Sequence, residues 1–276
     1  MIEFCVLGPL ELRSAGAAHT VRSHSQAMLL ISLLVSEGRQ VPAEALIDEL
    51  WGGGHPADPA NALQAHISRL RRMLDKLEPE GTGSRLTSHP AGYRLRVRDE
   101  ELDGCAFLAE VAALPVAAAQ LPPAEVTGRA RRVLGRWRGP VFGGVVGGAI
   151  CQAGAARYEQ GRHRALEALF EAELGCGNHG AIVPELSALV ATPSPFQERF
   201  CEQLMVALYR AGRQADALDL YHRTWSRLAG ETKTQPSGRL KAYVRAILEH
   251  DPVLALGGQR RHAAGAPVRR PAIAVR

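Results

Sequence analysis

The chain has 276 residues, of which 46% are hydrophobic and 22% are charged, and its formal net charge is +5 at pH 7. This is the composition of a globular protein long enough for two packed domains, so it excludes a chain that is disordered throughout. The five cysteines are isolated and odd in number, which argues against a disulfide framework or a zinc site and favours a reducing, cytoplasmic compartment.

The first residues, MIEFCVLGPLELRS, predict strand structure rather than a targeting segment. Apolar residues alternate from Ile2 onward, and Glu3 with no basic flank before it is unlike a signal peptide. Two helices are expected next. The segment SQAMLLISLLVSEG ends at Gly38, and VPAEALIDELWG has a proline in its first turn and Gly52 at its end.

The segment NALQAHISRLRRMLDKL, residues 61–77, predicts a helix with one apolar stripe and a cationic back. Asp58 and Pro59 provide an N-cap and a first helical residue with preset φ. The stripe repeats at spacings of four and three and consists of Leu63, Ile67, Leu70, Leu74 and Leu77. The other side carries Asn61, Ala65, Ser68, Arg69, Arg72 and Lys76.

Charge is sorted along this part of the chain. Residues 1–59 contain three Lys or Arg and seven Asp or Glu, whereas residues 60–98 contain eight and three. An ordinary solvated surface would also explain a cationic helix back, but the sorting favours an acidic polymer as partner.

The segment RLTSHPAGYRLRVR, residues 85–98, predicts a hairpin with a basic outer face, because Arg94, Arg96 and Arg98 alternate with apolar residues. Three helices with a basic third, followed by such a hairpin, form the layout of a winged helix-turn-helix. Its third helix lies in the DNA major groove, and its hairpin reaches the neighbouring backbone or minor groove. The stripe would then dock the helix on its own domain and turn its polar side chains toward nucleic acid. These are Asn61, Gln64, Ser68, Arg69 and Arg72.

From Leu102 onward the pattern is almost wholly helical. Aligning LGCGNHGAIVPEL with YRAGRQADALDLY places Gly177 over Gly212, an offset of 35 residues, close to the tetratricopeptide period of about 34 residues. We therefore expect stacked helical pairs rather than a compact bundle, with at least three pairs over residues 102–252. The uncharged stretch 139–156 contains six glycines, so we expect a loop leading into a helix there, not a membrane span.

Several segments together resemble the Streptomyces antibiotic regulatory protein family. They are FCVLGPLELR, ALIDELWG, ANALQAHISRLRRML, AGYRLRV, RWRGP, VPELSALV, ALYRAGRQADALDLYHR and LEHDPVL. The resemblance covers residues 1 to about 256. It implies an OmpR-type winged helix at residues 1–98 and a tetratricopeptide-like bacterial transcriptional activation domain at residues 99–256. The remainder, residues 257–276, is rich in Gly, Pro and Arg, and we expect it to be a basic disordered tail. Accessory contact between this tail and DNA stays an open alternative.

The resemblance also implies a function. Members of this family activate secondary-metabolite (antibiotic) biosynthetic clusters by binding tandem direct repeats in promoter DNA and recruiting RNA polymerase. The expected partners are double-stranded promoter DNA, a second protomer on that DNA, and the polymerase holoenzyme through its sigma factor and alpha subunit. We expect no membrane contact, no cofactor and no metal, and a cytoplasmic, nucleoid-associated protein.

The family's motifs fall on particular residues of this chain. Its recognition-helix pattern matches His66, Ser68, Arg69, Arg71 and Arg72, and its wing pattern matches Thr87, Gly92, Tyr93 and Arg94. His66 and Tyr93 are more readily explained as packing residues. The expected DNA-binding set is Asn61, Gln64, Ser68, Arg69, Arg71, Arg72, Lys76, Thr87 and Arg94. The expected polymerase-contacting loop consists of Gly52, Gly53, Gly54 and His55.

Two other function classes fit the sequence less well. The sequence has no phosphate-binding loop, nucleophile elbow or His-Glu-x-x-His pattern, which argues against an enzyme. The remaining alternative is a tetratricopeptide-type interaction scaffold with only non-specific nucleic-acid affinity. Salt-sensitive, sequence-specific DNA binding separates a regulator from both.

Overall fold

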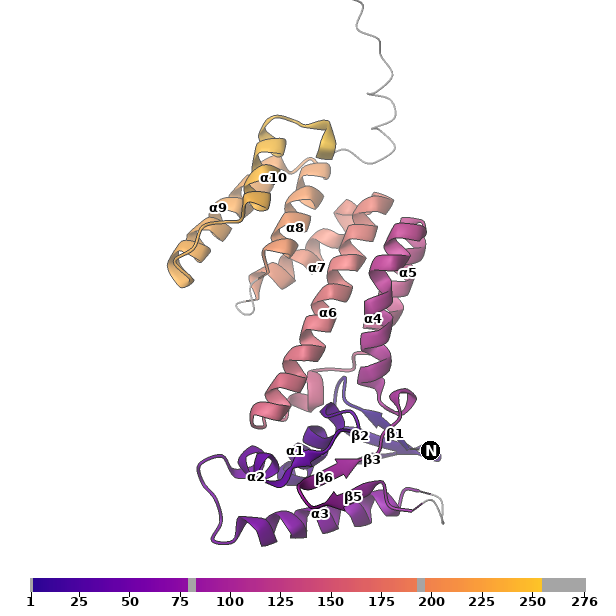
Figure 1. Cartoon of the computed structure of the whole chain (residues 1–276). Helices are drawn as coiled ribbons and strands as arrows, with labels where there is room; N and C mark the ends of the chain where they lie inside the picture. Colours follow the sequence, from indigo (N-terminus) through magenta and orange to yellow (C-terminus); the bar gives the residue numbers. More distant parts are fainter. Residues whose placement is uncertain (1, 79–82, 193–196, 255–276) are drawn as a thin grey trace, which may run out of the picture. The chain divides into compact units, whose positions relative to one another are not determined.

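The computed structural model describes residues 2–78, 83–192 and 197–254 (Figure 1). It is mainly α-helical with two small sheets, as the sequence predicts, and the expected tail at 257–276 lies outside the described residues. The strands are β1 (Ile2–Cys5), β2 (Glu11–Ser14), β3 (Ala17–Thr20), β4 (Val41–Pro42), β5 (Leu86–His89) and β6 (Gly92–Leu95). The α-helices are α1 (His24–Val35), α2 (Ala43–Trp51), α3 (Pro59–Asp75), α4 (Asp103–Gln120), α5 (Pro123–Leu134), α6 (Ala149–Cys176), α7 (His179–Ala191), α8 (Glu198–Arg210), α9 (Gln214–Glu231) and α10 (Gly238–Leu248). Short 3-10 turns are η1 (Asp99–Glu101), η2 (Val141–Gly144) and η3 (Pro252–Leu254).

The chain forms two compact units. The first contains residues 1–116 and 129–166, and the second contains residues 117–128 and those from 167 onward. The units therefore divide the chain at points other than residue 98. A part of the helical segment packs in the same unit as the winged helix.

The N-terminal sheet is antiparallel in the order β1-β2-β3. Strand β1 supplies buried side chains, including Ile2 and Phe4, as the alternation predicts. Strand β3 is not predicted by the sequence pattern, since all four of its residues are exposed. It forms because Ala15 and Gly16 both adopt positive φ, as a tight two-residue hairpin turn requires, and fold it back on β2.

Helices α1, α2 and α3 pack on one another next to a second sheet of order β4-β6-β5. Eight consecutive residues of α1, from Ala27 to Leu34, are buried, which makes this helix the centre of the small domain. The expected helix at 41–52 needs a correction. Val41 and Pro42 form β4 on β6, and α2 begins only at Ala43 because Pro42 has the extended backbone of an N-cap.

Helix α3 begins as its sequence predicts. The Asp58 side chain accepts a hydrogen bond from the Asn61 amide at 3.0 Å, and Pro59 occupies the first turn. The apolar stripe is buried at Leu63, Ile67, Leu70 and Leu74. This burial fixes the rotation of α3 about its own axis, so its opposite side is turned toward solvent.

Two turns of the helical segment recur at the offset that the sequence predicts. Gly177 follows α6 and Gly212 follows α8, and both have positive φ, near 83° and 75°. The offset of 35 residues thus relates two equivalent turns, one joining α6 to α7 and one joining α8 to α9. In the second unit α7 packs on α8, α8 on α9, and α10 on both α8 and α9.

The glycine-rich stretch 139–156 is a loop leading into a helix, as expected. It contains the turn η2 and the first residues of α6. Among the helices of residues 2–78, 83–192 and 197–254, none combines the length and the apolar character that a membrane crossing needs.

Candidate nucleic-acid interface

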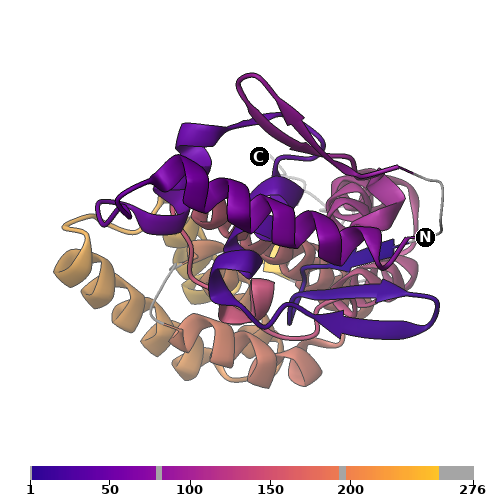
Figure 2. The same ribbon diagram turned by 90° about the horizontal axis from the view of Figure 1, so that it is seen from below.

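The solvent side of α3 carries mainly polar side chains, and we call it the α3 face. In Figure 2 this helix runs across the viewed end of the first unit, with the β5–β6 hairpin on one side of it. Its exposed residues are Asn61, Gln64, Ala65, Ser68, Arg69, Arg72 and Lys76. The N-terminal half is neutral and the C-terminal half carries three cations. Within the described part of the chain, none of these cations has a carboxylate at ion-pair distance, so their charge is uncompensated.

Arg71 differs from its neighbours on α3. Its Nε donates to the Leu86 carbonyl at 2.9 Å and its Nη2 donates to Ser88 Oγ at 3.0 Å. The side chain is half-buried. Arg71 therefore ties the helix to strand β5 and fixes the distance between the α3 face and the hairpin.

His66 packs against the domain, in agreement with the role expected of it. Its Nδ1 lies 3.1 Å from Gln26 Nε2, and its ring contacts the Trp51 ring edge-on at 5.9 Å. Burial is the larger cause that lowers the pKa of His66, and repulsion from the Arg69 charge lowers it further. The ring is consequently neutral at neutral pH and adds no charge to the α3 face.

The hairpin has two different faces. Thr87 lies opposite Arg94 in the β5–β6 register, on the outer face, whereas Leu86 and Leu95 point to the core. Arg94 Nε donates to the Gly38 carbonyl at 2.6 Å, so one edge of the guanidinium group is held in place while the residue stays exposed. Tyr93 is half-buried on the inner side.

Gly92 explains why the hairpin can pair with β4. Its φ is near 152°, and a Cβ at this position would lie 2.0 Å from the Val41 carbonyl oxygen. Only glycine permits the two strands to approach this closely.

A groove of about 480 Å³ separates α3 from the hairpin tip. Apolar residues of α2 and α3, including Ile47 and Leu63, form part of its lining. Polar groups from both sides also line it: Gln64, Ser68 and Arg71 from α3, and Ser88 and His89 from β5. The α3 face and the hairpin tip thus border the same groove.

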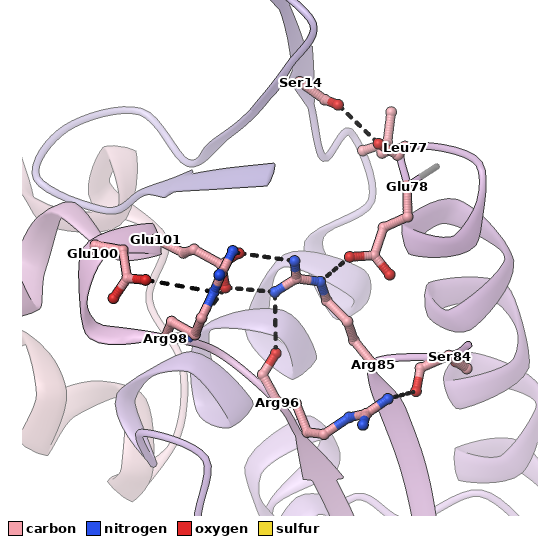
Figure 3. Close-up of polar contacts among 9 residues, drawn as sticks. All are labelled: Ser14, Leu77, Glu78, Ser84, Arg85, Arg96, Arg98, Glu100 and Glu101. Atoms are coloured by element: carbon pink, nitrogen blue, oxygen red, sulfur yellow. Dashed lines mark hydrogen bonds and ion pairs between the residues drawn. The ribbon is translucent and has the colours of Figure 1, made fainter. Parts of the chain in front are cut away.

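Sequence reasoning missed the group that fixes the base of the hairpin. Figure 3 shows Arg85, the residue just before β5, between two carboxylates. Its Nη1 and Nη2 donate to Glu101 at 2.6 Å and 2.8 Å, and its Nε donates to Glu78. Arg98 also donates to Glu101, at 2.7 Å. The alternating cations predict a basic face but contain no signal that singles out Arg85, because its partners are seven and sixteen residues away.

Glu101 is fully buried and ionised. Burial alone would raise the pKa of its carboxyl, but hydrogen bonds from Arg85 and Arg98 outweigh this and lower the pKa to about 2. The same contacts raise the pKa of Arg85. The hydrogen bond to Glu101 has the largest effect, burial opposes it, and the hydrogen bond to Glu78 raises the pKa further. This cluster joins η1, which opens the helical segment, to the hairpin.

The loop after α2 is exposed at all four residues that the sequence singles out: Gly52, Gly53, Gly54 and His55. Its one charged contact among the described residues is long, with 3.9 Å between His55 Nε2 and the Asp48 carboxylate. The loop thus presents glycine backbone and the His55 ring to solvent between α2 and the start of α3.

Comparison with known proteins agrees with this architecture. Residues 19–95 match the family "Transcriptional regulatory protein, C terminal", and residues 102–248 match "Bacterial transcriptional activator domain". The chain is 38% identical to the transcriptional regulator RedD of Streptomyces coelicolor, over 92% of this chain and 72% of RedD. It is 34% identical to the regulatory protein DnrI of Streptomyces peucetius, over 90% of this chain and 92% of DnrI.

A solved structure has the same fold. It is Mycobacterium tuberculosis EmbR in complex with a low affinity phosphopeptide, with a TM-score of 0.82 and 30% sequence identity, covering 96% of this chain and 69% of that one. The two family matches and the regulators among the relatives lead to one conclusion. The chain belongs to the Streptomyces antibiotic regulatory protein family and is a transcriptional regulator, with a winged-helix DNA-binding part and a bacterial transcriptional activator domain, rather than an enzyme.

Proposed function

We propose that this regulator activates a secondary-metabolite biosynthetic cluster by binding tandem direct repeats in promoter DNA and recruiting RNA polymerase. The observation that carries the proposal is the α3 face, a row of exposed amide, hydroxyl and cationic side chains on a helix whose other side is buried. Such a helix presents hydrogen-bonding groups of the kinds that base edges and phosphates accept in the major groove.

The two halves of the α3 face suit different parts of a duplex. Asn61 and Gln64 have the amides that pair with adenine, and Ser68 can bond to several bases. Arg69 and Arg72 can bond bidentately to guanine, while Lys76 at the helix end suits a phosphate. On the hairpin, Thr87 and Arg94 would contact the sugar-phosphate backbone. Arg71 would act by holding helix and hairpin together, as its two bonds to β5 support.

Direct repeats suit a head-to-tail arrangement of two protomers. Major-groove sites recur once per helical turn, about 10 to 10.5 bp, so protomers on repeats at that spacing lie on one side of the duplex. The contact between them joins unlike surfaces and need not persist without DNA. The polymerase would meet the exposed loop Gly52–His55 through its sigma factor and the activator domain through its alpha subunit.

The test is binding of the full chain to a duplex from the promoter of the adjacent cluster, measured by fluorescence anisotropy over a range of salt. If six to eight phosphates are neutralised, log K should fall with log salt with a slope of about −5 to −7. Footprinting should show protection at repeated half-sites on one side of the duplex. A slope near zero, or equal affinity for promoter and random duplexes, would contradict the proposal and favour a scaffold with incidental affinity for nucleic acid.

A further inference from the structure

A second groove lies at the base of the hairpin and is rich in arginine. Its volume is about 420 Å³, within the range of roughly 300 to 1,000 Å³ found for small-ligand sites. It is lined by Gly38, Glu78, Gly83, Arg85, Arg94, Arg96, Val97, Arg98 and Glu101. Arg94 and Arg96 reach it from the outer face of β6 and its extension, because alternate residues of a strand point to opposite sides.

The charges in this groove do not cancel. Its two lining carboxylates are both engaged, Glu78 by Arg85 and Glu101 by Arg85 and Arg98 (Figure 3). Arg94 and Arg96 have no such partner among the residues that the structure describes. Two guanidinium groups therefore face the groove with their charge uncompensated.

The same two side chains are already held in place. Arg94 Nε donates to the Gly38 carbonyl at 2.6 Å, and Arg96 Nη2 donates to the Ser84 carbonyl at 2.9 Å. Each bond uses one of the five N–H donors of a guanidinium, so most donors stay available. Anchored cations lose little side-chain entropy when they bind an anion, and two planar donor forks suit a tetrahedral oxyanion.

We propose that this groove binds one phosphate group through Arg94 and Arg96, with Arg85 and the carboxylates as its rigid wall. Two sources carry the same chemistry. One is a backbone phosphate of duplex DNA beyond the bases read by α3, which rests on the proposed function and extends the Arg94 contact given there to Arg96; the other is a free phosphate or phosphomonoester, which does not. Arg96 belongs to no DNA contact in the proposed function, so its substitution tests the groove separately from the α3 face.

The experiment uses the full chain with 15N-labelled arginine and follows the Nε–Hε resonances of Arg94 and Arg96. One arm titrates inorganic phosphate against chloride at matched ionic strength. The other arm measures the salt slope of binding to a promoter duplex with extended flanks. Both arms compare the parent with Arg96→Gln and with the charge-preserving Arg96→Lys, each checked by thermal unfolding. Arg223→Gln is the control, since this exposed arginine lies on α9, outside both the groove and the α3 face, and pairs with Asp219.

If the occupant is free phosphate, both resonances shift with phosphate and Arg96→Gln weakens binding about tenfold, as expected for one lost charge-assisted bond. If it is a DNA phosphate, they shift with DNA, and Arg96→Gln reduces the steepness of the salt slope by about 1. Arg96→Lys should retain most of either effect. Failure of both resonances to respond to phosphate and to DNA overturns the groove proposal. Loss of promoter specificity with an intact phosphate response contradicts only the proposed function.

Discussion

Glu49, near the end of α2, accepts a hydrogen bond from the Cys151 amide in the first turn of α6, at 3.0 Å. Its second carboxylate oxygen accepts from the Ile150 amide at 2.8 Å. The side chain is only 5% exposed, and a Cβ on Gly148 would lie 2.7 Å from one of its oxygens. A carboxylate of the winged helix thus caps a helix of the activator domain, where the helix dipole and free amides favour negative charge.

We expect Glu49→Gln to lower the free energy of unfolding by about 2 kcal/mol, because a neutral amide can replace only one of the two charge-assisted bonds and brings an N–H toward the other. Hydrogen exchange at the Ile150 and Cys151 amides should accelerate with it. The matched control is Asp48→Asn, next along the same helix, whose side chain is 74% exposed. Equal effects of the two substitutions would show that the cap contributes nothing specific.

The Glu101 cluster predicts a particular pH dependence. Folding lowers the pKa of Glu101 from an ordinary 4.5 to about 2, so as pH falls the unfolded chain takes up this proton first. The stabilisation, about 3 kcal/mol, is present above about pH 5 and is lost as pH falls toward 2. Glu101→Gln should remove that part of the acid sensitivity and destabilise the protein at neutral pH, because Arg85 then lacks its main partner.

Urea unfolding at several pH values checks this expectation. Glu100→Gln is the control, since that side chain is 63% exposed and its effect on stability should be small. An unchanged slope of stability against pH in Glu101→Gln would mean that another group causes the acid sensitivity.

Arg71 and Arg72 should separate stability from recognition. Arg71→Ala loses two bonds to β5 and should lower the free energy of unfolding by about 1 to 3 kcal/mol. Among the residues that the structure describes, the Arg72 side chain donates only to the Ser68 carbonyl of its own helix, and it is exposed, so Arg72→Ala should change stability by about 0.5 kcal/mol or less. Thermal unfolding of both variants measures this difference, and an equally large loss in Arg72→Ala would place that residue in the fold rather than on the α3 face.

The spacing of the operator repeats provides a separate prediction. Insertion of five base pairs between two repeats should rotate one protomer by about half a turn and abolish cooperative binding and activation. An insertion of ten should restore much of both. Transcription with purified polymerase is the measurement, and activation that survives the five-base-pair insertion would contradict the head-to-tail arrangement.

The sequence predicts local features of this protein well and distant contacts poorly. The start of α3 at Asp58 and Pro59 and its buried stripe follow from capping and periodicity within one helix. The hydrogen bond from the Cys151 amide to Glu49 joins residues 102 positions apart, and neither segment contains a sequence signal for contact with the other. Strand β3 was missed for a related reason, since its exposed residues form a strand only by pairing with β2.

The candidate site shows the same division. The exposure of Arg69, Arg72 and their neighbours follows from the position of the apolar stripe, so the α3 face could be predicted residue by residue. The roles of Arg71, Arg85 and Arg94 could not, because all three are cations in a basic stretch. Only the folded structure shows that Arg71 and Arg94 bond to backbone carbonyls and that Arg85 pairs with carboxylates.

The most direct test of the central claim is the ratio of affinities of the full chain for the operator and for a random duplex, measured at one fixed salt concentration. Arg69→Ala and Arg72→Ala should each weaken operator binding by about 1 to 3 kcal/mol and reduce that ratio, since base-edge contacts are lost only on the operator. Thr87→Ala, on the hairpin, should weaken both duplexes about equally and leave the ratio unchanged. If both arginine variants keep the parent's operator affinity and ratio, α3 is not the helix that reads DNA.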